Sequence, residues 1–76
     1  MRIVSQDGCY DLPYERAMLK RVGTSIFAKT TFGDLIVVAQ YHEEEKAIKA
    51  MEMCTRKYEI FNASVFKFPK DSEVEA

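Results

Sequence analysis

The stretch "HEEEKAIKAMEMCTRKYEIFN", residues 42–62, decides the fold. Apolar side chains recur in it every three or four residues, as they do in a helix with one buried side. Successive helical residues are about 100° apart, and this spacing gathers the apolar positions within a sector of roughly 100°. The sector holds Ala47, Ala50, Met51, Cys54, Tyr58 and Phe61. The pattern predicts a helix over residues 43–61 that buries these side chains against a sheet.

Charge placement supports the same helix. Three glutamates, residues 43–45, occupy its first turn, where the positive end of the helix dipole favours acidic side chains. Lys57 lies near the other end, where a basic side chain is favoured. Asn62 follows and tolerates the left-handed conformation that ends many helices. We therefore expect the helix to end just before residue 62.

Short β segments lie on both sides of this helix. Turn signals such as Asp7-Gly8 and Gly33-Asp34 separate apolar runs that are typical of strands. The predicted strands cover residues 2–5, 9–14, 18–22, 25–31, 35–41 and 64–68. Residues 35–41 are apolar on both faces and are expected to form a central strand. The order predicts an α+β fold: a mainly antiparallel sheet of about five strands, then the helix on one face, then a final strand.

The chain is short, and its composition is that of a folded domain. It has 76 residues, 47% of them hydrophobic and 30% charged, with a net charge of -1. One domain is expected over residues 1–69, followed by a frayed acidic tail over residues 70–76. The near-zero net charge favours neither nucleic acid nor an anionic membrane as the partner. No apolar run is long enough for a signal peptide or a membrane span, so we expect a cytoplasmic protein with no membrane partner.

No catalytic or metal site can be assembled from the residue pattern. His42 precedes three glutamates, but consecutive helical side chains diverge and cannot converge on one ion. Cys54 is twelve residues from His42, about 18 Å along a helix, and therefore lacks a base. Cys9 has no evident activating neighbour, and two lone cysteines are not a secreted disulfide framework. The prediction is a non-enzymatic protein with no catalytic residue, no metal and no cofactor.

Five residues are candidates for an interaction surface. Met53 and Ile60 are seven apart and lie on a flank of the helix outside the apolar sector. They suit contact either with a loop of the same chain or with a second copy in a homodimer. Arg16, Lys20 and Arg21 supply basic charge in the N-terminal half. Lys20 and Arg21 are neighbours on a strand and should face opposite sides of the sheet, which weakens a single basic patch.

Two aromatic residues have basic neighbours, as sheet surfaces that bind nucleic acid do. Phe27 lies near Lys29, and Phe66 precedes Lys67. A small domain needs its aromatic side chains for the core, so burial of both Phe27 and Phe66 is the favoured interpretation. Nucleic-acid binding stays as the alternative.

Three short motifs carry a family resemblance. "SQDG" at residues 5–8, "PYE" at residues 13–15 and "EEKA.KAMEM" at residues 44–53 resemble small uncharacterised proteins of prophages and other mobile elements of Gram-positive bacteria. The resemblance implies phage or bacterial origin, a cytoplasmic setting and a non-catalytic role. The leading hypothesis is thus a small interaction module that binds an unknown protein partner. The alternative is a nucleic-acid-binding accessory protein that uses the basic residues of the N-terminal half.

Overall fold

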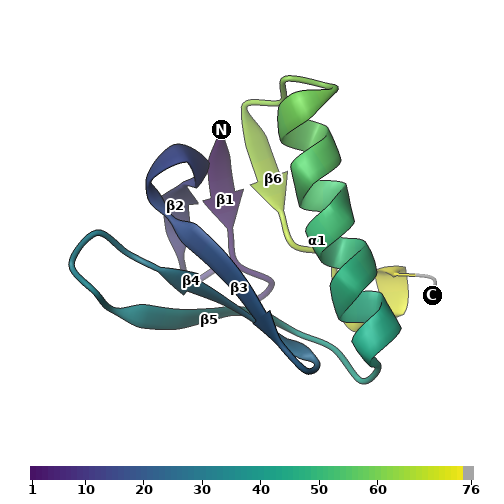
Figure 1. Cartoon of the computed structure of the whole chain (residues 1–76). Coiled ribbons are helices and arrows are strands. Elements are labelled where there is room, and N and C mark those ends of the chain that lie inside the picture. Colours follow the sequence, from purple (N-terminus) through teal and green to yellow (C-terminus); the bar gives the residue numbers. More distant parts are fainter. Residues whose placement is uncertain (75–76) are drawn as a thin grey trace.

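The computed structural model of the chain describes residues 1–74, which form an α+β fold of two three-stranded sheets and one helix (Figure 1). The predicted fold class is confirmed. The strands are β1 (Arg2–Val4), β2 (Asp11–Pro13), β3 (Met18–Val22), β4 (Ser25–Lys29), β5 (Leu35–Gln40) and β6 (Val65–Lys67). The helix α1 spans Glu44–Glu59, and two short 3-10 turns, η1 (Tyr14–Arg16) and η2 (Asp71–Glu73), complete the fold.

The first sheet joins the two ends of the chain. Its strand order is β2-β1-β6, with β1 antiparallel to β2 and parallel to β6. In the central strand Ile3 lies opposite Leu12 on one side and Phe66 on the other. The β1–β2 connection is ordered by Asp7, whose carboxylate accepts the Cys9 amide at 3.0 Å.

The second sheet is the antiparallel meander that the turn signals predicted. Its order is β3-β4-β5, and β3 has the predicted bounds. Gly23 takes the positive φ of 61° required at the first position of the two-residue turn between β3 and β4. β5 was predicted as a central strand, and this was wrong: it is an edge strand, because β1 pairs with β6 rather than extending the meander. In Figure 1 the β4–β5 hairpin projects away from α1.

The helix packs through its smallest side chains. Ala47, Ala50 and Cys54 are fully buried, and their size lets the helix backbone approach the sheets closely. The expected burial of Met51 holds only in part. The expected burial of Tyr58 was wrong, since its side chain is exposed; its ring centroid lies 4.6 Å from that of Tyr14. The expected burial of Phe61 was wrong, since its side chain is 64% exposed.

The helix end explains the exposure of Phe61. The α-helix stops at Glu59, so the 100° spacing no longer applies two residues later. Asn62 adopts the left-handed conformation with φ of 49°, as its place in the sequence predicted. The amide of Ala63 then donates to the Lys57 carbonyl at 3.0 Å and directs the chain back toward β6.

One core lies between α1 and the two sheets. Its largest fully buried side chains include Phe68, Ile3, Ile26 and Val38. Phe68 meets Phe66 edge to face, with ring centroids 5.2 Å apart. This geometry is favourable for aromatic pairs and is worth about 0.5–1.5 kcal/mol beyond the area that they bury.

The tail expected to fray over residues 70–76 is instead folded as far as Val74, which is buried in the core. Asp71 anchors it: its carboxylate accepts the His42 amide at 2.8 Å and Lys46 Nζ at 3.1 Å. The His42 amide, followed by Lys46, holds the pKa of Asp71 below its usual value. The remaining tail residues, 75 and 76, lie outside the described part of the chain.

Tyr41 holds the segment just before η2. Its hydroxyl donates to the Pro69 carbonyl at 2.7 Å. Burial, with the nearby charges of Asp71 and Glu73, raises the pKa of Tyr41 to about 12. The tyrosine therefore stays neutral and keeps its donor at physiological pH.

Candidate protein-binding surface

The face of the second sheet that points away from the core is the candidate site. Cross-strand partners share a face, and residues alternate along each strand. Met18, Lys29 and Leu35 form one row across the three strands, and Lys20, Phe27 and Val37 form the next. These six residues, with Val22 at the end of β3, are called the outer face below. The opposite face contains the buried side chains of Ile26 and Ala28.

Large apolar side chains are exposed on the outer face. Met18 is 60% exposed and Leu35 59%, and Val22 and Val37 are also exposed. Met18 and Leu35 are both diagonal neighbours of Phe27, and Val37 lies directly across from it, so the apolar residues of the outer face adjoin one another around Phe27. A contiguous surface of this kind marks an interaction site more often than single exposed apolar residues do.

Two lysines stand within this apolar surface. Lys20 lies directly across from Phe27, and Lys29 lies two residues further along β4. Together with Met18, Gly33 and Leu35 they line a hollow of about 320 Å³. Within residues 1–74, neither Lys20 nor Lys29 takes part in an ion pair. The outer face is therefore apolar with a localised positive charge.

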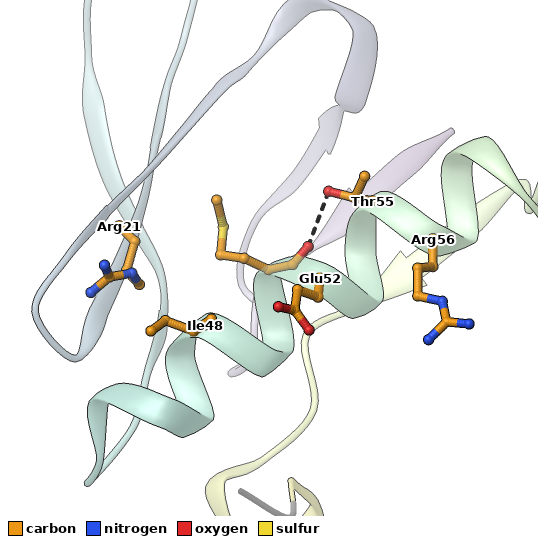
Figure 2. Close-up of a pocket in the computed structure, with 6 residues that line it drawn as sticks. Arg21, Ile48, Glu52, Thr55 and Arg56 are labelled. Carbon is orange, nitrogen blue, oxygen red and sulfur yellow. Dashed lines mark hydrogen bonds between the residues drawn. The ribbon is translucent and has the colours of Figure 1, made fainter.

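A larger groove of about 560 Å³ lies between β3 and α1. In Figure 2, Arg21 reaches from its strand toward Ile48 on the helix, and Glu52 and Arg56 lie further along α1. The Arg21 guanidinium is already engaged, because it contacts Glu44 at 3.2 Å and donates to the Gly23 carbonyl at 2.9 Å. Of the charged side chains that line this groove, Arg21 is therefore satisfied within the chain, whereas neither Glu52 nor Arg56 takes part in an ion pair within residues 1–74.

The three basic residues that sequence reasoning selected do not come together. Lys20 is on the outer face, and Arg21 is in the groove beside α1. Arg16, in η1, lines a third hollow of about 280 Å³ together with Phe32 and Asp34. The expectation that Lys20 and Arg21 face opposite sides is confirmed, and no single basic patch forms from these three residues.

Met53 and Ile60 differ in their surroundings. Met53 is partly buried and packs against the core, whereas Ile60 follows the end of α1 and is exposed. The flank therefore presents one exposed apolar side chain instead of two. A homodimer through this flank stays a prediction.

Of the two aromatic residues with basic neighbours, only one is in the core. Phe66 is buried as expected, whereas Phe27 is on the outer face and does not join the core cluster. Sequence reasoning also missed Met18, Leu35 and Val37 as surface residues. The three strands alternate between two sets of residues, one for each side of the sheet. This alternation identifies the residues that share a side only when the pairing of the strands is known.

The groups with potential for chemistry are separated from this surface. Cys54 is buried in the helix, and burial raises the pKa of its thiol to about 11, so it is a poor nucleophile. Cys9 is exposed near the β1–β2 connection. Within residues 1–74, no group of three or more His, Cys, Asp or Glu side chains could hold a metal ion.

Comparison with known proteins found no relative of this chain. No family model, curated protein or solved structure matches the chain. Within the part of the chain that the structure describes, no helix has both the length and the apolar character that crossing a membrane would need.

Proposed function

We propose that this protein is a non-catalytic interaction module that binds a protein partner through the outer face. The observation that carries the proposal is the exposure of Met18, Val22, Leu35 and Val37 on one side of a sheet whose other side contributes Ile26 and Ala28 to the core. A partner that covered these side chains would remove apolar surface from water, which stabilises a complex by about 25 cal/mol for each Å².

The geometry of the ionisable groups supports a non-catalytic role. Asp11 pairs with Arg2, Glu15 with the N-terminal amine, and Asp71 with Lys46. These pairs join separate parts of the fold. Each of these carboxylates is therefore accounted for by a structural contact, and none of them lies on the outer face.

The resemblance of residues 5–8, 13–15 and 44–53 to prophage proteins supports a further proposal. We assign the module to a phage or mobile element and to the cytoplasm, where its two unpaired cysteines remain reduced. Cell fractionation of the tagged chain tests the location: recovery in a membrane or secreted fraction would contradict it.

Photo-crosslinking in cells tests the proposed surface. A photoreactive amino acid at position 37 lies on the outer face, and the same group at position 49 lies on the exposed side of α1. We expect a discrete protein adduct from position 37 alone. The adduct should disappear when Met18→Ser and Leu35→Ser are added, because these changes remove apolar contact area while preserving the fold. No adduct at position 37, or equal adducts at both positions, would contradict the proposal.

Single-stranded nucleic acid is the second candidate partner. Phe27 between Lys20 and Lys29 resembles an aromatic platform with flanking cations. Two phosphate contacts would give a slope of about -1.4 for the logarithm of the binding constant against the logarithm of salt concentration. Binding of a thymidine oligonucleotide with that slope, lost in Phe27→Ala, would favour this candidate over a protein partner.

A further inference from the structure

The hollow between Lys20 and Lys29 carries information about the chemistry of the partner. Its walls combine two ammonium groups with the apolar side chains of Met18 and Leu35, and Gly33 contributes no side chain. An apolar partner that covered it would also remove both lysines from water. Burying a charged group is costly unless the charge is paired, so the partner must bring acceptors to both ammonium groups.

We propose that the outer face recognises an acidic extended segment of a partner protein, with one carboxylate for Lys20 and one for Lys29. This inference rests on the proposed function and specifies its partner. The outer face contains no acidic residue, so its charge is complementary to such a segment. The nearby Asp34 lines a different hollow, with Arg16.

The spacing of the two lysines fits an extended segment. Lys20 is opposite Phe27, and Lys29 is two residues beyond Phe27, so the lysines are diagonal neighbours. The backbone positions of diagonal neighbours across antiparallel strands are about 7–8 Å apart. In an extended chain, side chains two residues apart are on the same side and about 6.7 Å apart. Carboxylates at alternate residues therefore match the two lysines. Flanking apolar residues on the same side of the segment would lie near Val22, beyond Lys20, and near Leu35, beyond Lys29.

A second copy of this chain is a poor occupant. Two-fold stacking of the outer face on itself would bring the lysines of one copy toward those of the other. No acidic side chain on that face would compensate them.

Nucleic acid is also less favoured than an acidic protein segment. Most of the outer face is aliphatic, and its one aromatic side chain, Phe27, is partly buried. Sequence-tolerant binding of single strands depends on stacking of several bases on aromatic rings.

Two blocked peptides test this proposal by NMR titration. One has the sequence Leu-Ser-Glu-Ser-Glu-Ser-Leu, which places two carboxylates and two leucines on one side when extended. The other has glutamine at both glutamate positions. We expect the glutamate peptide to bind about tenfold more tightly, from two ion pairs at a partly desolvated surface. The amide signals of β3 and β4 should shift on binding.

Matched variants test whether Lys20 and Lys29 cause the difference in affinity between the two peptides. The double variant Lys20→Met, Lys29→Met should bind both peptides equally, whereas Lys49→Met, which changes an exposed lysine of α1, should retain the tenfold difference. Equal binding of the two peptides by the natural protein, or binding of neither, would overturn the acidic-segment proposal. Tighter binding of a thymidine oligonucleotide than of the glutamate peptide would also overturn it. The crosslink from position 37 is independent of peptide choice, so its presence would leave the proposed function standing if the peptide test failed.

Discussion

Replacing Phe68 by alanine tests the packing that places the helix and both sheets around one core. Phe68 is 1% exposed and meets Phe66 edge to face. Phenylalanine-to-alanine changes in cores cost about 3–5 kcal/mol, because they remove buried apolar area and leave a cavity. A domain of 76 residues has a total stability of about 4–11 kcal/mol at typical values per residue. The substitution should therefore remove a large share of the stability.

Urea unfolding followed by circular dichroism measures the effect. With a slope near 1 kcal/mol per M, a loss of about 3 kcal/mol lowers the midpoint by about 3 M. Phe68→Leu preserves more of the buried volume and should cost about 1–1.5 kcal/mol, which provides a measurable value if the alanine variant is unfolded.

Phe32 supplies the matched control. It is the same residue type but 92% exposed, so Phe32→Ala should change the free energy of unfolding by no more than about 0.5 kcal/mol. Phe61→Ala should behave like this control rather than like Phe68→Ala, because Phe61 follows the end of α1. Equal unfolding midpoints for Phe68→Ala and Phe32→Ala would refute the assignment of the core.

Three further outcomes are expected. Cys9 should react quickly with a thiol reagent and Cys54 only as fast as the protein unfolds, because Cys54 is buried with a pKa near 11; fast reaction of both would contradict its burial. Asp71→Asn should lower the melting temperature. Because folding lowers the pKa of Asp71, the difference in melting temperature from the natural protein should be largest above the ordinary carboxyl pKa of about 4. It should shrink as the pH falls through the lowered pKa. A difference that grows in acid would contradict that contact. Asn62→Gly should leave the urea midpoint unchanged or higher, whereas Asn62→Val should cost about 1 kcal/mol or more, since φ is positive there; equal midpoints would contradict the left-handed turn.

Local signals predicted most of the elements. Turn residues such as Gly23 and the apolar periodicity of residues 43–61 report on backbone conformation within a few positions, and this was enough to place α1 and the strand β3. The pairing of β1 with β6 was not predictable in this way. Those strands are about sixty residues apart in the chain, and no local pattern specifies which strands meet. The sequence therefore predicted a single sheet, whereas the structure has two.

The surface was harder to predict than the elements. Whether Phe27 or Leu35 is buried depends on which side of the sheet α1 covers, and alternation along a strand does not identify the covered side. For the tail the error was in the other direction, because it was expected to be exposed but is folded as far as Val74. Val74 is one apolar residue in a polar run, which is too weak a signal to predict docking, yet the contacts of Asp71 with His42 and Lys46 hold it in place.

The most direct test of the central claim is a thiol-protection measurement at position 37, made in cells and on the purified protein. Val37→Cys places a thiol on the outer face, and the natural Cys9, exposed near the β1–β2 connection, is an internal reference. If the outer face binds a partner, the new thiol should be labelled more slowly in cells than in the purified protein, measured relative to Cys9. The same relative rate in both settings would contradict the claim that this face is a binding surface.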